Sequence, residues 1–121
     1  MLVIDDSVPV RKRVAAVLAE IPGVDAVLEC GGSVDALELL REQSPEIIVL
    51  DLNLRGESGL AFMRRAKLGS VRPLLIVLTN ESSERHRREC VARGADHFFD
   101  KSRDVDHLLG VVAKAAARSG R

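Results

Sequence analysis

Aromatic residues are scarce in this chain, and its charges of opposite sign balance. The 121 residues include three phenylalanines but no tryptophan or tyrosine, so no stacking platform for nucleotide bases is available. Lys and Arg number 18, as do Asp and Glu, so the formal net charge is zero. Bulk positive charge therefore cannot drive binding to nucleic acid or to an anionic membrane, and we expect neither as a direct partner.

Cysteines and long apolar runs are few as well. Cys30 and Cys90 lie far apart, without a Cys or His at metal-ligand spacing, and we interpret both as free thiols of a cytoplasmic protein. The longest strictly aliphatic run, residues 74–78, is too short to cross a bilayer. Asp5 and Asp6 interrupt the first apolar run, so we expect no signal peptide.

The remaining composition is that of one globular domain. Hydrophobic residues make up 46% of the chain and charged residues 30%, a balance that excludes disorder. We expect a single domain over residues 1–121, structured over about residues 2–118 and frayed at residues 119–121.

Short apolar runs alternate with amphipathic segments along the whole chain. The runs at 46–50 and 74–78 are continuously apolar, which is typical of strands buried on both faces of a parallel sheet. The pattern predicts an α/β fold: a single doubly wound (βα)5 flavodoxin-like domain with a parallel sheet of order 2-1-3-4-5. Strands are predicted at residues 2–4, 24–29, 46–50, 74–78 and 97–99, and helices at residues 7–21, 33–40, 60–69, 83–93 and 104–115.

Local signals refine the predicted helices. Ser7, Ser33 and Asp104 stand at expected N-caps, and Val34 and Leu37 are expected to face the core. The arginine-rich helix 83–93 suits either partner docking or a solvated face with the ion pairs Glu84–Arg88 and Glu89–Arg93, and we favour the solvated face. The apolar, alanine-rich last helix suits packing or a weak homodimer, and the sequence leaves both open.

Polar side chains follow four of the predicted strands at their carboxyl ends, where parallel sheets bind ligands. Asp5 and Asp6 follow the first strand, Asp51 the third, Thr79 the fourth and Lys101 the fifth. Clustered carboxylates repel one another and require a cation, and hard oxygen ligands suit Mg²⁺. Lys101 and Thr79 would then contact phosphoryl oxygens, so the set predicts a phosphoryl site with Asp51 as a carboxylate nucleophile.

With these residues in place, the chain resembles the receiver domain of two-component response regulators, the CheY-like domain. The matching stretches are LVIDDS (residues 2–7), IIVLDLNLRGESGL (47–60), LLIVLT (74–79) and GADHFFDKS (94–102). The resemblance covers essentially the whole chain, in order. It implies a signalling domain that is not an enzyme beyond its own phosphorylation and dephosphorylation, whose partners are a sensor histidine kinase or phosphotransfer protein and an unknown output protein or domain.

The resemblance also implies a role for each site residue. Asp51 would accept the phosphoryl group, and Asp5, Asp6, Asp51 and the backbone carbonyl of Asn53 would hold Mg²⁺. Lys101 would pair with the phosphoryl group. Thr79 would swing toward it and Phe98 would follow as the switch aromatic, which would remodel the face made by the fourth helix, fifth strand and fifth helix.

Some positions depart from the family pattern. Ser102 follows Lys101 where the family usually has a proline in a cis peptide bond, so either this bond is trans or the site is strained. Asn80 replaces a small residue, and Arg55 and Glu57 stand on the rim beside Asp51.

Two further rim positions, Asn53 and Glu81, influence the phosphoryl lifetime in the family. Their pairing resembles chemotaxis-type regulators, which predicts fast self-dephosphorylation.

Two rival hypotheses remain. The chain could be a phosphorylation-independent, receiver-like interaction module. Ser102 and Asn80, which depart from the family pattern, support this hypothesis. It could also be a haloacid-dehalogenase-type phosphatase, which likewise uses a strand-end Asp, Mg²⁺, a Thr or Ser and a Lys. The general acid of those phosphatases, two residues after the nucleophile, is Asn53 here, which weakens that hypothesis.

Overall fold

The computed structural model of the chain describes residues 1–54, 58–66 and 72–119. The predicted rim residues Arg55 and Glu57, the expected helix end near Gly69 and the end of the predicted tail lie outside these ranges. Strands and helices alternate through the described part of the chain, as β1 (Leu2–Ile4), α1 (Val8–Ala19), β2 (Leu28–Cys30), α2 (Ser33–Gln43), β3 (Ile47–Leu50), α3 (Gly59–Ala66), β4 (Leu74–Thr79), α4 (Glu84–Ala92), β5 (His97–Asp100) and α5 (Val105–Ser119).

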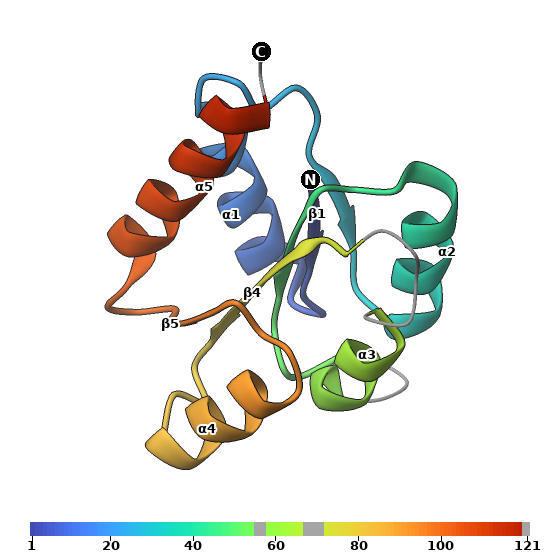
Figure 1. The fold of residues 1–121 in the computed structure, drawn as a ribbon, viewed down its shortest axis with the longest axis vertical. Coiled ribbons are helices and arrows are strands. Elements are labelled where there is room, and N and C mark those ends of the chain that lie inside the picture. Colours follow the sequence, from blue (N-terminus) through green and yellow to red (C-terminus); the bar gives the residue numbers. More distant parts are fainter. Residues whose placement is uncertain (55–57, 67–71, 120–121) are drawn as a thin grey trace.

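The strands form one parallel sheet of order β2-β1-β3-β4-β5, which confirms the predicted flavodoxin-like topology. Figure 1 shows α1 and α5 on one side of the sheet and α2 and α3 on the other. In the described part of the chain, no helix is long and apolar enough to cross a membrane.

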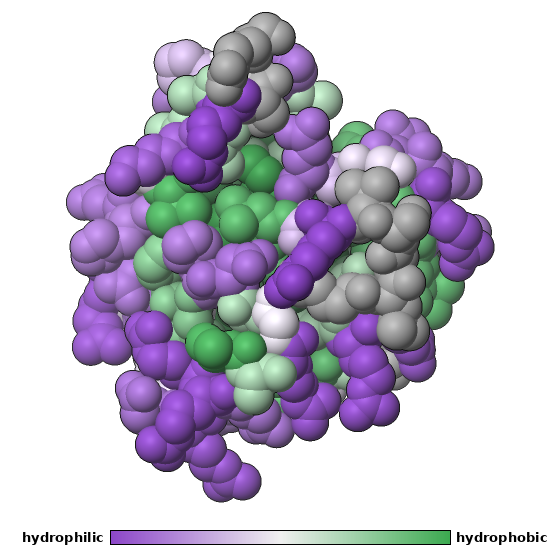
Figure 2. All heavy atoms as spheres, viewed as in Figure 1, coloured by the Kyte–Doolittle hydropathy of each residue, from purple (hydrophilic) through white to green (hydrophobic). Residues whose placement is uncertain are grey.

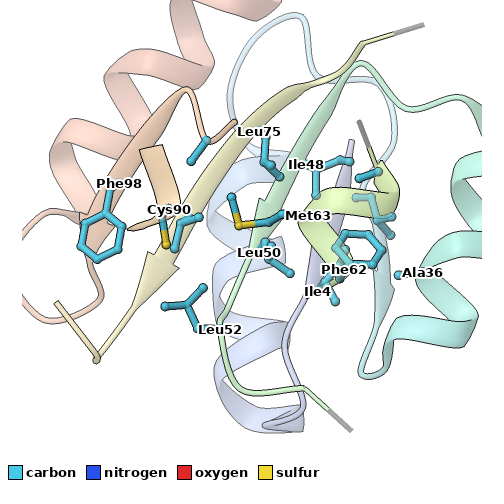
Figure 3. Packing of buried hydrophobic residues seen from close by; sticks show 14 of the residues in the cluster. Ile4, Ala36, Ile48, Leu50, Leu52, Phe62, Met63, Leu75, Cys90 and Phe98 are labelled. Carbon is cyan, nitrogen blue, oxygen red and sulfur yellow. The ribbon is translucent and has the colours of Figure 1, made fainter. Parts of the chain in front are cut away.

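Each face of the sheet has its own hydrophobic core, because the side chains of a strand point alternately to opposite faces. One core joins Val3, Val49 and Ile76 to Leu18 of α1 and Leu108 and Val112 of α5. The other joins the alternate strand residues to α2, α3 and α4 (Figure 3), and contains Leu2, Ile4, Ala36, Ile48, Leu50, Phe62, Met63, Leu75, Val77, Cys90 and Phe98. The continuous apolar runs that predicted the inner strands are thus buried on both sides.

The second strand is shorter and starts later than predicted. The prediction covered residues 24–29, whereas β2 pairs with β1 only from Leu28, opposite Leu2, to Cys30, opposite Ile4. Since β2 is an edge strand with one neighbour, it can extend only as far as the three residues of β1 do. Residues 24–27, despite their alternating apolar and polar pattern, therefore form the segment that leads into β2.

The start of α2 also differs from the prediction by one residue. Gly32, not Ser33, occupies the N-cap, and Ser33 is the buried first residue of the helix. Val34, which was expected to face the core, is 71% exposed, and Ala36 lies in the core instead. Ser7 does stand at the N-cap of α1, but its side chain makes no capping hydrogen bond.

The outer surface of α4 is hydrophilic, as Figure 2 shows at the lower left of the view. Glu89 pairs with Arg93 at 3.5 Å, as predicted, whereas Glu84 lies 3.8 Å from Arg87 rather than pairing with Arg88. The buried side chain of α4 is Cys90, and burial, together with the neighbouring Glu89 carboxylate, raises the pKa of its thiol to about 11. α4 is thus a solvated helix held to the sheet by a narrow contact.

Gly59 lets α3 approach the segment that follows β3. Its N–H donates to the Leu52 carbonyl at 2.8 Å, so the helix begins directly against this segment. A Cβ at position 59 would lie 2.8 Å from both the Asp51 carbonyl oxygen and the Leu52 Cα, which are backbone atoms that cannot move aside cheaply. The close approach therefore requires glycine.

We expect Gly59→Ala to lower the free energy of unfolding by about 1–3 kcal/mol, because the added methyl overpacks a backbone contact. Gly110→Ala is the matched control: nothing lies within 4 Å of a Cβ there, so replacing a mid-helix glycine should stabilise the protein by up to about 1 kcal/mol. Urea unfolding followed by circular dichroism measures both. Equal stability of the two variants would contradict the close approach.

Candidate functional site

Three aspartates meet at the carboxyl edge of the sheet, where the sequence placed them. Asp5 and Asp6 follow β1 and Asp51 follows β3, which is the hydrogen-bonded neighbour of β1. One carboxylate oxygen from each lies within 4.8 Å of those of the other two. Asp5 and Asp51 are buried, while Asp6 is exposed. The cluster therefore has two fixed carboxylates and one that faces solvent.

Lys101 bridges the two buried carboxylates. Its Nζ lies 2.6 Å from Asp5 Oδ2 and 3.0 Å from Asp51 Oδ2, and its side chain is 13% exposed. The lysine comes from the far side of β4, immediately after the edge strand β5, so its side chain reaches across the sheet edge to this site. The sequence predicted Lys101 at this edge, and the structure shows which carboxylates it contacts.

Burial and charge act on this triad in opposite directions. Burial raises the pKa of Asp5, and the nearby Asp51 adds to this, although hydrogen bonds from Lys101 and the Ser7 N–H oppose it. Burial alone would lower the pKa of Lys101, but its hydrogen bonds to Asp5 and Asp51 outweigh this and raise it. The ammonium is therefore held in its charged form between two carboxylates that share it.

Backbone contacts fix the orientation of each buried carboxylate. Asp51 Oδ1 accepts from the Leu52 N–H at 2.8 Å, which leaves Oδ2 for Lys101. Asp5 Oδ1 accepts from the Ser7 N–H at 3.0 Å, and the Asp5 carbonyl accepts from Arg11 Nη1 at 3.0 Å. Both carboxylates are thus oriented before any ligand binds.

The donor set fits a divalent cation. Three carboxylates and one ammonium leave a net charge of −2 if all are ionised, and the oxygen ligands are of the hard type that Mg²⁺ and Ca²⁺ prefer. Asp6 offers an accessible oxygen beside the two buried groups. Asn53, the remaining predicted ligand, is exposed two residues after Asp51.

Thr79 ends β4 and is fully buried. Its Oγ1 accepts a hydrogen bond from the Glu81 N–H at 3.1 Å, and its carbonyl accepts from the Lys101 N–H at 3.0 Å. The Glu81 carboxylate lies 3.4 Å from His86 Nε2 of α4. The hydroxyl is thus tied to the segment between β4 and α4, and its strand is tied to the backbone of Lys101.

Phe98 lies in the core between β5 and α4. It is 3% exposed, and Figure 3 shows it at the end of the cluster where Cys90 lies. The Arg87 guanidinium lies 5.2 Å from the ring centroid, and Arg87 Nη2 donates to the Phe98 carbonyl at 3.4 Å. The predicted switch aromatic therefore occupies a buried position covered by an α4 side chain.

Sequence reasoning missed Asp100, which directly follows the strand predicted at residues 97–99. The Asp100 carboxylate is buried and accepts hydrogen bonds from Ser82 and Ser102, on two different loops. The Asp-Lys-Ser order could have suggested a turn, since an Asp side chain often bonds the backbone two residues on. The described residues contain no cis peptide bond, so the Lys101–Ser102 bond is trans.

Comparison with known proteins yields one family. The family model of the response regulator receiver domain matches residues 1–113. A protein-glutamate methylesterase/protein-glutamine glutaminase of Anaeromyxobacter dehalogenans is 35% identical over 99% of this chain and 36% of its own length. The nitrate/nitrite response regulator protein NarP of Escherichia coli is 29% identical over 98% of this chain and 55% of its own length. The chain thus spans only about a third to a half of these relatives.

Solved structures agree in fold. A LuxR-family two-component response regulator from Aurantimonas superposes with a TM-score of 0.87 at 25% identity, over 96% of this chain and 83% of that one. A Burkholderia pseudomallei response regulator, solved with a phosphorylated aspartic acid, calcium ion and citrate, gives a TM-score of 0.82 at 27% identity, over 97% and 68% of the two chains. With its fold, its strand-end residues and these similarities in agreement, the chain belongs to the receiver domains of response regulators.

Proposed function

We propose that this receiver domain accepts a phosphoryl group on Asp51 from a phosphohistidine of a sensor kinase or phosphotransfer protein. The P–N bond of the donor breaks, a bond forms between phosphorus and a carboxylate oxygen of Asp51, and the leaving imidazole nitrogen takes up a proton. The product is an acyl phosphate. The observation that carries this proposal is the Lys101 ammonium bonded to both Asp5 and Asp51 at the sheet edge.

Lys101 supports the transfer electrostatically. A phosphoryl group carries about two negative charges, and an ammonium already desolvated and oriented stabilises this charge without reorganising. Thr79 adds a hydroxyl whose O–H can donate to a phosphoryl oxygen, since its bond to the Glu81 N–H uses only an acceptor lone pair. These residues bind and orient the group that Asp51 receives.

Mg²⁺ is the proposed cofactor. Asp5, Asp6, Asp51 and the backbone carbonyl of Asn53 would hold it, and the net negative charge of the carboxylates and Lys101 supports this assignment. When bound, the ion neutralises charge between the carboxylates and the incoming phosphoryl oxygens.

The proposed readout is the surface of α4, β5 and α5. Rotation of Thr79 toward a phosphoryl group would free the Glu81 N–H and shift the segment that leads into α4. Phe98 and its covering Arg87 join that helix to β5, so a shift of α4 changes the surface around them. An output protein or domain, of the kind suggested by the greater length of the relatives, would bind this surface.

The phosphorylation-independent module remains the alternative. Ser102 is trans-linked and Asn80 is exposed beside Thr79, and neither is the usual family residue. The intact contacts among Asp5, Asp51 and Lys101 favour the phosphoacceptor function over it. The phosphatase alternative has no second carboxylate at position 53 to act as general acid.

With acetyl phosphate and Mg²⁺, intact-mass spectrometry should show one added phosphoryl group on the wild-type protein and none on Asp51→Asn, because the amide is not a nucleophile. Chelating Mg²⁺ should also prevent the addition. Asp106→Asn removes an exposed carboxylate on α5 and should behave as wild type. No adduct on the wild type, together with no binding of beryllofluoride, would establish the phosphorylation-independent module instead.

The acyl phosphate should decay quickly if Asn53 and Glu81, which follow Asp51 and Thr79 by two residues, orient an attacking water. Replacing both residues by alanine should lengthen its half-life by about tenfold, since positioned polar groups that orient an attacking water contribute at least this much. Mass spectrometry after removal of acetyl phosphate measures the decay. Glu84→Ala, a nearby exposed carboxylate on α4, should leave it unchanged. A slow decay of the wild-type acyl phosphate that is unchanged by the double substitution would refute the role assigned to Asn53 and Glu81.

A further inference from the structure

The Asp100 carboxylate lies between two loops of the site. Asp100 is 6% exposed and ends β5, immediately before Lys101. In the sheet register it stands opposite Thr79, the last residue of β4. Asp100 is therefore adjacent to Lys101 in the sequence and to Thr79 in the sheet, so its contacts can position both residues.

Five hydrogen-bond or ion-pair donors converge on this one carboxylate. Oδ1 accepts from the Ser102 N–H at 2.8 Å, the Ser102 hydroxyl at 2.6 Å and the Arg103 N–H at 3.2 Å. Oδ2 accepts from the Ser82 hydroxyl and lies 3.5 Å from Arg103 Nη2. The hydrogen bonds from Ser102 and Ser82, aided by the Arg103 charge, hold the pKa of Asp100 well below its usual range. The carboxylate stays ionised and anchored.

Two hydrogen bonds between Asp100 and Asp104 complete the turn. The Asp100 N–H donates to Asp104 Oδ2 at 2.9 Å, and its carbonyl accepts from the Asp104 N–H at 2.9 Å. Lys101 thus lies in a short turn, between Asp100 and Ser102, which are both fixed by hydrogen bonds. With the Lys101–Ser102 bond trans, these contacts set the direction in which the lysine leaves the strand.

The bond from Ser82 adds a connection to the other loop. Ser82 lies between Glu81, whose N–H bonds Thr79 Oγ1, and Ser83, whose hydroxyl caps α4. The segment expected to respond to Thr79 is thus tied directly to the residue beside Lys101.

We propose that Asp100 is a positioning residue: through Ser82 and Ser102 it holds Lys101 on Asp5 and Asp51 and links the lysine to the Thr79 loop. The proposal rests on the proposed function for its consequence in phosphoryl transfer. Its structural core, the placement of Lys101, can be tested without any phosphoryl group.

The first test is a double-mutant cycle on Mg²⁺ affinity, measured by isothermal titration calorimetry. Lys101→Ala should tighten binding about threefold or more, because a competing positive charge leaves the carboxylates. Asp100→Asn should also tighten it, by releasing the lysine, and should have no such effect when Lys101 is already alanine. If Asp100 acted only through its negative charge, its loss would weaken Mg²⁺ binding. The direction of the change in Mg²⁺ affinity therefore separates the positioning role from a purely electrostatic one. Asp106→Asn controls for the removal of a carboxylate, because Asp106 is exposed in the first turn of α5. Weaker binding by Asp100→Asn, or an equal effect in both backgrounds, would overturn the proposal.

The second test measures phosphoryl uptake from acetyl phosphate. Asp100→Asn should slow it by about tenfold, since small misplacements of a positioning group cost at least that much, and Ser102→Ala should slow it less. Ser102→Ala keeps the carboxylate, so it serves if Asp100→Asn unfolds, as circular dichroism would reveal. Wild-type rates in both variants would refute the proposal while leaving the phosphoacceptor function intact. A wild-type protein that binds Mg²⁺ but takes up no phosphoryl group would refute the function, and the Mg²⁺ cycle would still decide the role of Asp100.

Discussion

Charge crowding at one edge of the sheet is the constraint on which this site depends. Three carboxylates lie within 4.8 Å of one another, and two of them are buried. Such a cluster is unfavourable without positive charge close by. Lys101 supplies one such charge within the described residues, in contact with both buried members. The ammonium therefore offsets part of the repulsion and leaves a site that still attracts cations.

The rest of the fold keeps this crowded edge in place. Both faces of the inner strands are buried, so packing holds the strand ends in place. Gly59 also brings α3 against the segment that carries Asp51. The site residues lie at the ends of strands or in the loops that follow them, as is common where a rigid sheet presents functional residues. Under the proposed function, a charge change at Asp51 would act through the hydrogen bonds of these loops, while the sheet beneath them stays fixed.

Local patterns predicted most of this structure. Continuous aliphatic runs identified β3 and β4, and the residues after the strands identified Asp5, Asp51 and Lys101 as neighbours. What depends on a distant partner was not predictable. The extent of β2 follows from the length of β1, and the role of Asp100 follows from Ser82, which is 18 residues away. Helical spacing alone also did not show that Val34 faces solvent while Ala36 is buried.

The narrow attachment of α4 has a consequence for local stability. Its buried side chain, Cys90, is fully enclosed, while most of the helix surface is solvated. Helices with few buried contacts open at a lower free energy than the global unfolding reaction. A thiol reacts as the thiolate, which both enclosure and the raised pKa of Cys90 suppress in the closed state. The rate at which Cys90 is alkylated would therefore report how often α4 opens away from the sheet. This makes the side chain an intrinsic reporter of local opening.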